Sequence, residues 1–265
     1  MIKNKKRGFT LAEILITLGV IGVIAALTIP QIIDYTMKAK IEGNLARAVE
    51  QVEIGCQNLI QYANDNTSDS TYANGISVLW TDSNSKLYTE GSSNRHPLVV
   101  GGSMFKQFAP FYGLDFFGDS STGNKDDYKN YKKELKDKNS AVGSIVSGIE
   151  QYFLGLWKMK NSNAIVSLDY SFSWPATNQG VGYFPIFIDA NGIQKPNKYG
   201  RDVFFFGLSD SCKMIPAGSQ RFIDDHTAYG NMIPLATTAC KDDGITNGLS
   251  CTTRVVENGF KINYW

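Results

Sequence analysis

The chain opens with a polar, basic stretch and then becomes almost continuously apolar over residues 9–33. A helix of roughly 25 residues rises about 37 Å, which exceeds the ~30 Å hydrocarbon core of a bilayer. The run therefore predicts a helix that can span a membrane. One carboxylate, Glu13, interrupts it, although a charged side chain inside the hydrocarbon costs roughly 2.5–3.5 kcal/mol on insertion scales. Glu13 consequently calls for a functional explanation.

After residue 34 the apolar positions become periodic, which predicts that the helix continues as an amphipathic segment over residues 34–63. Spacings of three and four residues place the following side chains on one helical face: Ile41, Leu45, Ala48, Val52, Cys56 and Leu59. Charged residues fill other positions and predict an exposed face: Lys38, Lys40, Glu42, Arg47, Glu50 and Glu53. One helix over residues 9–63 would be roughly 80 Å long. Its second half needs a partner surface to cover the apolar stripe.

Residues 64–265 form the globular part, and their pattern changes along the chain. Polar segments at 64–100 and 118–142 predict loops, so that 64–142 forms a polar insertion. Short helices are predicted within 101–117 and 140–157. A period of two then predicts antiparallel strands within 163–174, 182–190 and 201–208, with a fourth at 259–265. We therefore expect an α+β fold in which the long helix packs on an antiparallel sheet.

Composition excludes several functional classes. The 265 residues contain 26 Lys and Arg against 25 Asp and Glu, so charge gives no reason to infer a nucleic-acid partner. The sequence has only two histidines and lacks G-x-S-x-G, H-E-x-x-H, C-x-x-C and Gly-rich phosphate-loop motifs. We therefore expect no enzymatic activity. The four cysteines are an even set that can form disulfides outside the cytoplasm.

Four cations directly precede the apolar run, and no comparable cluster follows it: Lys3, Lys5, Lys6 and Arg7. This bias predicts a cytoplasmic N-terminus and an extracytoplasmic globular part. A cleaved secretory signal fits poorly, because the run is long and no A-x-A site follows it. An ordinary membrane anchor leaves Glu13 unexplained, and a buried helix of a soluble protein leaves the cations unexplained.

The junction Arg7-Gly8-Phe9-Thr10-Leu11-Ala12-Glu13 resembles that of type IV prepilins and of type II secretion pseudopilins. The resemblance covers about the first 50 residues. It implies a leader of residues 1–8, which a prepilin peptidase/methyltransferase removes after Gly8 before methylating the new N-terminal Phe9. It also implies a pilin-like fold and a single pass through the bacterial inner membrane, followed by assembly into a pilus or a periplasmic pseudopilus. The implied partners are copies of the chain, other pilins or pseudopilins, and an inner-membrane assembly platform with its cytoplasmic ATPase.

Within this resemblance Glu13 acquires a role. Cleavage would give Phe9 an ammonium group that stays charged after methylation. In a low-dielectric environment an unpaired charge is costly, and pairing recovers much of that cost. Between copies displaced along a fibre, Glu13 of one copy can meet the Phe9 amine of the next, so Glu13 would fix the register. The alternative interpretation is a protonated Glu13 near the membrane interface.

Pro30 lacks an N–H group and therefore predicts a kink or local unwinding near residues 28–30. In fibres of similar pilins, the stretch between such a glycine and proline can be melted. The corresponding stretch here is 22–30.

The resemblance thus favours a structural filament subunit, major or minor, without catalysis of its own. The alternative is a membrane-anchored extracytoplasmic binding protein or adhesin that does not enter a filament. Processing at Gly8 separates the two hypotheses.

Cys240 and Cys251 enclose a polar, glycine-containing segment. A disulfide there would restrain about a dozen residues and contribute roughly 3 kcal/mol on the loop-entropy model. It would resemble the disulfide-bounded C-terminal loop of type IV pilins. Cys56 and Cys212 either form a second bridge or remain buried thiols.

The loop that follows the second predicted strand is long for a hairpin. Asp189, Asn191 and Asp202 supply oxygens of the kind that calcium binds. The loop is not an EF-hand, because Gly200 occupies the twelfth position, and it does not match residue by residue the Asp-bearing calcium loops of some pseudopilins. The alternative is a hydrogen-bonded Asx/Gly turn without metal, and no other cofactor is expected.

Overall fold

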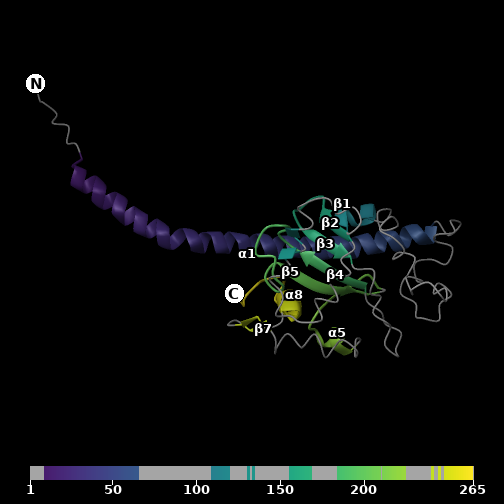
Figure 1. The fold of residues 1–265 in the computed structure, drawn as a ribbon. Coiled ribbons are helices and arrows are strands. Elements are labelled where there is room, and N and C mark those ends of the chain that lie inside the picture. Colours follow the sequence, from purple (N-terminus) through teal and green to yellow (C-terminus); the bar gives the residue numbers. More distant parts are fainter. Residues whose placement is uncertain are drawn as a thin grey trace, which may run out of the picture. The chain divides into compact units, whose positions relative to one another are not determined.

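A computed structural model describes ten stretches of the chain (Figure 1): residues 9–65, 109–119, 130–131, 133–134, 155–168, 184–209, 211–224, 240–241, 244–245 and 248–264. The chain divides into two compact units, residues 1–40 and 41–265. Helix α1 (Leu11–Asp65) contributes to both. Each unit is described by itself below.

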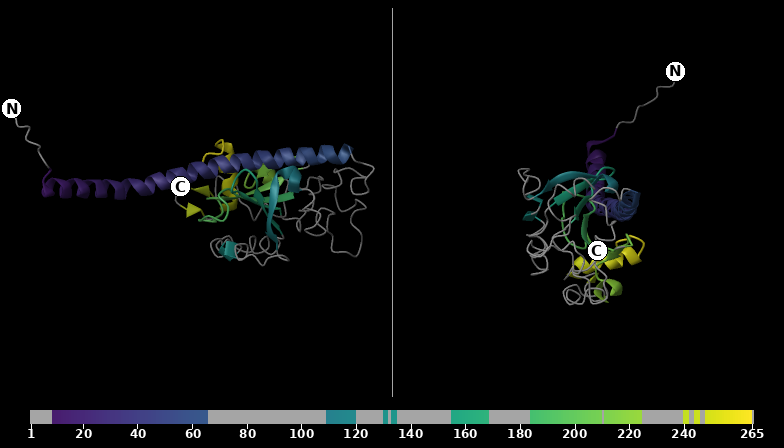
Figure 2. Two further views of the ribbon diagram at one scale, coloured as in Figure 1. Left: turned by 90° about the horizontal axis from the view of Figure 1, so that it is seen from above. Right: turned by 90° about the vertical axis from the view of Figure 1, so that its right-hand side faces the viewer.

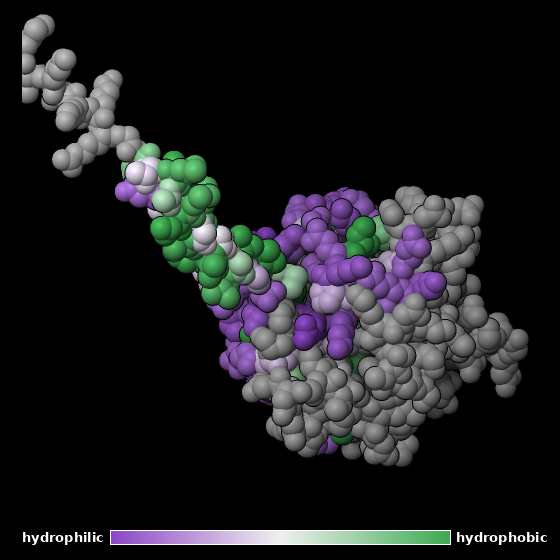
Figure 3. All heavy atoms as spheres, turned by 60° about the vertical axis from the view of Figure 1, so that its left-hand side comes forward, coloured by the Kyte–Doolittle hydropathy of each residue, from purple (hydrophilic) through white to green (hydrophobic). Residues whose placement is uncertain are grey.

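In the first unit, α1 is apolar and exposed. An 18-residue window of this helix has a mean hydropathy of 2.3, none of the window is buried, and its length and composition suffice to cross a membrane. Figure 3 shows the apolar side chains at the surface. The helix is continuous through Pro30, so of the kink or local unwinding predicted near residues 28–30, the single chain shows no unwinding. The Thr28 hydroxyl donates to the Ile24 carbonyl at 2.9 Å, a side-chain-to-backbone bond of the kind that often bends a helix.

The second unit is built around a six-stranded antiparallel sheet with the order β1-β2-β3-β4-β5-β6. Its strands are β1 (Leu114–Asp119), β2 (Gly155–Met159), β3 (Ile165–Leu168), β4 (Phe184–Asp189), β5 (Val203–Leu208) and β6 (Met214–Pro216). The described residues of this unit also form short elements: η2 (Ala109–Tyr112), α5 (Gln220–Asp224), the pair β7 (Cys240–Lys241) and β8 (Gly244–Ile245), η4 (Gly248–Ser250) and α8 (Cys251–Glu257). Each strand pairs with its neighbours in sequence, so the sheet is a simple meander.

The part of α1 within this unit runs alongside the sheet (Figure 2). Ile41, Leu45, Ala48 and Val52 are fully buried, and Cys56 is 1% exposed. The predicted apolar face is therefore confirmed at these five positions, while the Leu59 side chain lies outside the described residues. Removing such a face from water is the main driving force that holds an amphipathic helix on a sheet.

Polar side chains of α1 add specific links to the head. Asn44 Nδ2 donates to the Ala190 carbonyl at 2.8 Å, and Gln51 Nε2 donates to the Tyr112 carbonyl at 2.8 Å. Glu53 Oε1 accepts from the backbone N–H of Met214 at 2.9 Å. These bonds satisfy loop and strand-end groups that the sheet itself leaves unpaired.

Glu42 was predicted to lie on the exposed face of the helix, and this is wrong. Its side chain is buried because Oε1 accepts from the backbone N–H of Ile262 and Oε2 accepts from Lys261 Nζ, both at 2.9 Å. Charge patterning cannot reveal such a partner, since Ile262 is distant in sequence.

Strands β4 and β5 form the centre of the core. Residues of β5 are all buried, as expected where a strand is covered on both faces. Phe187 of β4 lies opposite Phe205 of β5, and their rings stack with centroids 4.4 Å apart. Phe222 of α5 meets the Phe205 ring edge-on at 5.7 Å. The predicted strands at 163–174, 182–190 and 201–208 correspond to β3, β4 and β5 in their described parts.

Two predicted helices differ from the structure where it describes them. In the segment 101–117, whose residues 101–108 lie outside the described residues, a single 3₁₀ turn, η2, is followed by strand β1. The end of the segment 140–157 is the start of β2, while residues 140–154 lie outside the described residues. Phe116 of β1 pairs with Trp157 of β2. Aromatic residues favour strands when they meet across a sheet, and this tertiary pairing overrides the helical spacing.

The C-terminal segment 259–265 is not a strand in its described part, residues 259–264. Ile262 and Tyr264 are buried while Lys261 and Asn263 are exposed, so the predicted alternation is present. The backbone N–H of Ile262 donates to the side chain of Glu42 on α1 and not to a neighbouring strand. The expected α+β arrangement, a long N-terminal apolar helix with an antiparallel sheet, is confirmed and is consistent with a pilin-like fold.

Candidate functional site

The start of α1 forms a reciprocal hydrogen-bonded cap between Thr10 and Glu13. The Glu13 carboxylate accepts from the Thr10 backbone N–H at 2.8 Å and from the Thr10 hydroxyl at 2.9 Å. In return, the Glu13 backbone N–H donates to the Thr10 hydroxyl at 3.2 Å. This is a capping box, whose sequence signature is T-x-x-E. The sequence Thr10-Leu11-Ala12-Glu13 carries this signature, so the cap is a signal that the sequence alone contains.

The capping box places the carboxylate at the very start of the exposed apolar helix. A negative charge at a helix N-terminus is favoured by the helix dipole. Phe9, directly before the cap, is 86% exposed. Gly8, after which cleavage is expected, lies outside the described residues. The start of the apolar helix therefore carries an exposed aromatic residue, Phe9, and four positions later an acidic residue, Glu13.

Both candidate disulfides are present in the structure, and together they use all four cysteines. Cys56 on α1 is joined to Cys212, a residue with a positive φ of 58° between β5 and β6. Cys56 and Cys212 were expected either to form a disulfide or to remain buried thiols, and the structure has the disulfide. Cys240 is joined to Cys251, the first residue of α8, over a sequence separation of 11.

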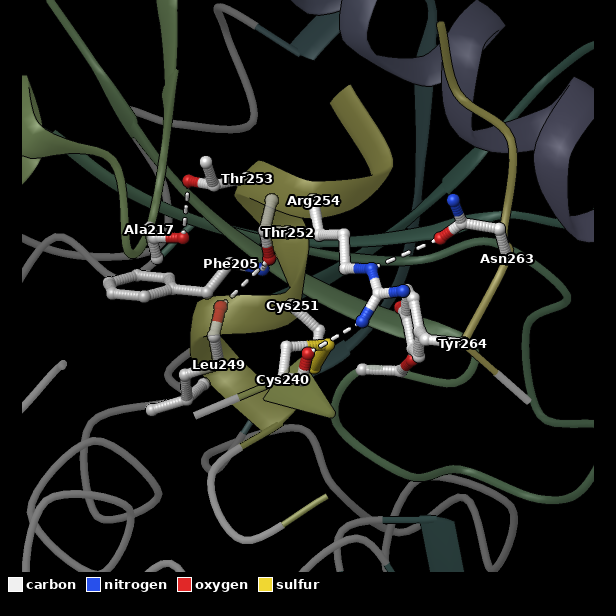
Figure 4. Close-up of a disulfide and its surroundings, with 11 residues drawn as sticks. Phe205, Ala217, Cys240, Leu249, Cys251, Thr252, Thr253, Arg254, Asn263 and Tyr264 are labelled. Carbon is white, nitrogen blue, oxygen red and sulfur yellow. Dashed lines mark hydrogen bonds between the residues drawn. A yellow bond between two sulfur atoms is a disulfide. The ribbon is translucent and has the colours of Figure 1, made fainter. Parts of the chain in front are cut away.

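Arg254 of α8 organises the surroundings of the Cys240–Cys251 bridge (Figure 4). Its Nη1 donates to the Cys240 carbonyl at 2.8 Å, and its Nε donates to Asn263 Oδ1 at 3.1 Å. The guanidinium lies 5.3 Å from the centre of the Tyr264 ring. The Arg254 side chain thus links the disulfide loop to the C-terminal segment through hydrogen bonds. Its position over the Tyr264 ring adds a cation–π interaction.

Helix α8 also completes an edge of the sheet beyond the end of β6. The Thr252 hydroxyl accepts from the Phe205 backbone N–H at 3.0 Å, and the Thr253 hydroxyl donates to the Ala217 carbonyl at 2.9 Å. Figure 4 shows both side chains directed toward these residues, Phe205 in β5 and Ala217 directly after β6. The sequence did not predict α8, because its turns contain no long apolar periodicity.

The three residues proposed from sequence as calcium ligands come together at the base of the loop between β4 and β5. Asp189, Asn191 and Asp202 are 2%, 2% and 0% exposed. The Asn191 backbone N–H donates to Asp189 Oδ1 at 3.2 Å, which is the predicted Asx-type turn. Within the described residues, no group of three or more His, Cys, Asp or Glu side chains gathers, so any metal here would rest on two carboxylates and an amide.

The two carboxyl groups are perturbed by their surroundings. Burial, reinforced by the neighbouring charge of Asp202, raises the pKa of Asp189 well above its usual value. Burial also raises the pKa of Asp202 to about 6, although hydrogen bonds from the Lys198 and Asn197 backbone oppose the shift. Burial therefore makes the charged form of each carboxyl group less favourable than it would be in water.

Comparison with known protein families concerns the N-terminal segment. Residues 3–29 match the family model described as the prokaryotic N-terminal methylation motif. The match supports the expected type IV pilin or pseudopilin type of prepilin signal. A motif of this type implies processing by a prepilin peptidase and assembly with other pilins. With the apolar helix, it fits a membrane-anchored bacterial protein.

The motif belongs to structural, non-enzymatic proteins. The match lies within the basic N-terminal stretch and the apolar run and does not extend into the second unit, residues 41–265. No solved structure matches the chain.

Proposed function

We propose that this chain is a structural subunit, a pilin or pseudopilin, of a type IV pilus or a type II secretion filament. The prepilin peptidase removes residues 1–8 after Gly8 and methylates Phe9. The apolar helix first holds the protein in the inner membrane, with its N-terminus in the cytoplasm and its head outside. The same helix later packs among copies in the filament core.

One observation carries this proposal: an exposed apolar helix has an acidic residue, Glu13, in its first turn, and the family model of the methylation motif matches this same stretch of the chain. The large apolar side chains of residues 11–33 are exposed to between 45% and 76%. A surface of this kind is stable only in lipid or against other apolar surfaces. A filament subunit meets both environments in turn: the lipid of the membrane before assembly and the apolar helices of other copies after it.

Glu13 has a specific part in this proposal. In the single chain its carboxylate accepts hydrogen bonds from Thr10, but these bonds leave its negative charge uncompensated. In the filament, the ammonium group of the mature Phe9 on a neighbouring copy compensates that charge. Docking in the correct stagger then gains the energy of an ion pair in low dielectric, while other staggers leave two charges unpaired.

The substitution Glu13→Gln tests this role. Glutamine at this helix position also forms a capping box, so the variant removes the charge and keeps the local cap. We expect the Glu13→Gln protein to be processed and to remain in the membrane fraction, but to be at least ten-fold depleted from sheared filaments of the native host. The matched control is Thr10→Val, which removes the two hydrogen bonds of the Thr10 hydroxyl and leaves both the Thr10 N–H bond to Glu13 and the charge of Glu13.

The two variants separate the possible explanations. Depletion in Glu13→Gln that exceeds depletion in Thr10→Val supports charge pairing between copies. Normal incorporation of Glu13→Gln contradicts the pairing. Membrane localisation of the wild-type protein with no copies in any filament would instead favour the anchored binding protein or adhesin.

A further inference from the structure

Two acids bracket the uncharged part of the exposed helix. Glu13 lies in the first turn of α1, and Asp34 is the next acidic or basic residue along the chain. Residues 14–33 between them carry no charged side chain, and a helix of this length rises about 30 Å. The hydrocarbon core of a bilayer is also about 30 Å thick. The bracket therefore defines one register in which neither acid enters the hydrocarbon.

The hydroxyl groups inside this bracket donate to the helix itself. Thr17 Oγ1 donates to the Ile14 carbonyl and Thr28 Oγ1 donates to the Ile24 carbonyl, both at 2.9 Å. Hydrocarbon contains no water that could accept these protons, so a lipid-facing segment needs such internal bonds. Residues 14–33 can therefore lie in lipid without an unpaired hydroxyl group.

The residues that flank the bracket suit a membrane–water interface. Tyr35 comes directly after Asp34, and its side chain is 74% exposed. Tyrosine is enriched at membrane interfaces because its ring is apolar and its hydroxyl is polar. At the other end, a basic cluster within residues 3–7 precedes the helix on the cytoplasmic side. Both ends of residues 14–33 thus adjoin side chains suited to the headgroup region.

A second register competes, because the apolar run of residues 9–33 is longer than the hydrocarbon core. If Phe9 marked the cytoplasmic boundary, residues 9–28 would fill the core, and Glu13 would lie in hydrocarbon. Three large apolar side chains would leave the core at the other end: Ile29, Ile32 and Ile33. Both changes are unfavourable, since burying a charge and exposing large apolar side chains each cost free energy.

The bracketed register has smaller costs. It leaves Phe9 and Leu11 in the headgroup region, and such side chains are common on helices that bind at the membrane interface. Gln31 lies only about 4 Å inside the boundary, so its amide can reach the headgroups. Glu13 keeps contact with water. The bracketed register is therefore the favoured one.

We propose that Glu13 and the pair Asp34 and Tyr35 fix the register of α1 in the membrane, with residues 14–33 in the hydrocarbon and Glu13 among the phospholipid headgroups of the cytoplasmic leaflet. This inference rests on the membrane-bound stage of the proposed function. The Glu13 carboxylate stays hydrated while the subunit is in the membrane, and it loses water only when the helix enters the filament core. The drive to pair with Phe9 of a neighbouring copy therefore begins at assembly.

The depth of the helix in a bilayer tests the register. All four native cysteines form disulfides, so one introduced cysteine can carry a nitroxide label. Labels at Ala12, Ala25 or Thr36 are compared in the full mature chain, reconstituted into vesicles of phosphatidylethanolamine and phosphatidylglycerol. Collision rates with oxygen and with a water-soluble nickel chelate report the depth of each label.

The two registers predict different depths. In the bracketed register, the Ala25 label lies within about 3 Å of the bilayer midplane, and the Ala12 and Thr36 labels lie outside the hydrocarbon. In the competing register, the Ala25 label lies about 10 Å from the midplane, and the Ala12 label lies about 5 Å inside the hydrocarbon. We expect the first pattern.

The substitution Glu13→Leu tests whether the acid sets the register. Without this charge the uncharged run extends back to Phe9, so the Ala12 label should move about 4 Å toward the midplane. The matched control is Glu50→Leu, because Glu50 is exposed on α1 beyond the bracket. In this control the three labels should keep their wild-type depths.

The outcomes separate this inference from the filament proposal. A wild-type Ala12 label inside the hydrocarbon, or one that Glu13→Leu does not move, overturns the register and leaves the filament proposal standing. If the nickel chelate reaches all three labels, the helix does not enter the bilayer, and the register and the membrane stage of the proposed function both fail. The wild-type depths decide if Glu13→Leu cannot be purified.

Discussion

The Glu13 carboxylate is bound to the backbone N–H and the hydroxyl of Thr10, three residues earlier at the start of α1. This relationship gives Glu13 a structural role in the single chain before any neighbour is present. It orients the acid toward the N-terminal end of the helix, where the amine of the mature chain would lie. The cap and the proposed pairing between copies are therefore compatible, and they predict different responses to substitution.

Thr10→Val should loosen the start of the helix without removing the charge. Loss of a capping side chain costs about 1 kcal/mol, which corresponds to roughly five-fold faster local opening. Hydrogen exchange of the mature protein in detergent should show this increase at the amides of Glu13 and Ile14, which donate to the Thr10 hydroxyl and carbonyl. Thr10→Ser keeps the hydroxyl and should exchange like the wild type. Equal exchange in Thr10→Val and wild type would show that the cap does not hold this helix end.

Two glycines on α1 make a matched pair for the packing of the helix on the head. A Cβ at Gly55 would lie 2.6 Å from Tyr112 Cδ1 and 2.9 Å from the Phe111 carbonyl oxygen, whereas a Cβ at Gly43 would meet nothing within 4 Å. Gly55→Ala should therefore destabilise the protein by about 1–3 kcal/mol through overpacking. Gly43→Ala should stabilise it by about 0.5–1 kcal/mol, because alanine is the better helix former.

Urea unfolding of the two glycine variants in the same detergent measures both effects. The sign difference is the informative result, since both substitutions add one methyl group to the same helix. Equal effects would mean that the helix does not approach Tyr112 as closely as described.

Glu42 should anchor the C-terminal segment through the backbone N–H of Ile262 more than through the ion pair with Lys261. Glu42→Ala leaves a buried N–H group without a partner, which costs about 1–3 kcal/mol of unfolding free energy. Lys261→Ala removes only a side chain that is 69% exposed, and a surface ion pair contributes less than about 1 kcal/mol. The unfolding midpoints in urea should fall in that order, and an equal loss in both variants would assign the stability to the ion pair.

The two disulfides should differ in their contribution to stability. Cys56 and Cys212 are 156 residues apart in sequence, whereas Cys240 and Cys251 are 11 apart. The loop-entropy model gives about 5 kcal/mol for the long loop and about 3 kcal/mol for the short one. Replacing the first pair by alanine should lower Tm more than replacing the second. The reverse order would mean that native-state strain or residual unfolded structure dominates the loop entropy.

Sequence patterns predicted the parts of the fold that depend on local periodicity. Ile41 to Cys56 repeat at helical spacing, so the buried face of α1 follows from the sequence alone. Strands β4 and β5 were likewise predicted from their alternating or continuous apolar runs. Such segments bury one face, or both, regardless of where their partners occur in the chain.

The errors arose where a distant partner decides the structure. Trp157 lies in a segment with helical spacing, but it pairs with Phe116 in the neighbouring strand. Glu42 carries a charge, but the Ile262 N–H brings it into the interior. At the base of the β4–β5 loop, the sequence identified Asp189, Asn191 and Asp202 as oxygen donors. Their burial, and the hydrogen bond that the Tyr131 hydroxyl donates to Asp189, depend on tertiary packing and could not be derived from spacing.

Mass spectrometry of the mature protein from its native host tests the filament assignment most directly. We predict a chain that begins at Phe9 and carries one methyl group on its N-terminal amine, because the Gly8–Phe9 junction lies within the matched methylation motif. The control is a Gly8 substitution, which should leave the leader attached. A mature wild-type protein that retains Met1, or one cleaved beyond Ile33, would contradict the assignment.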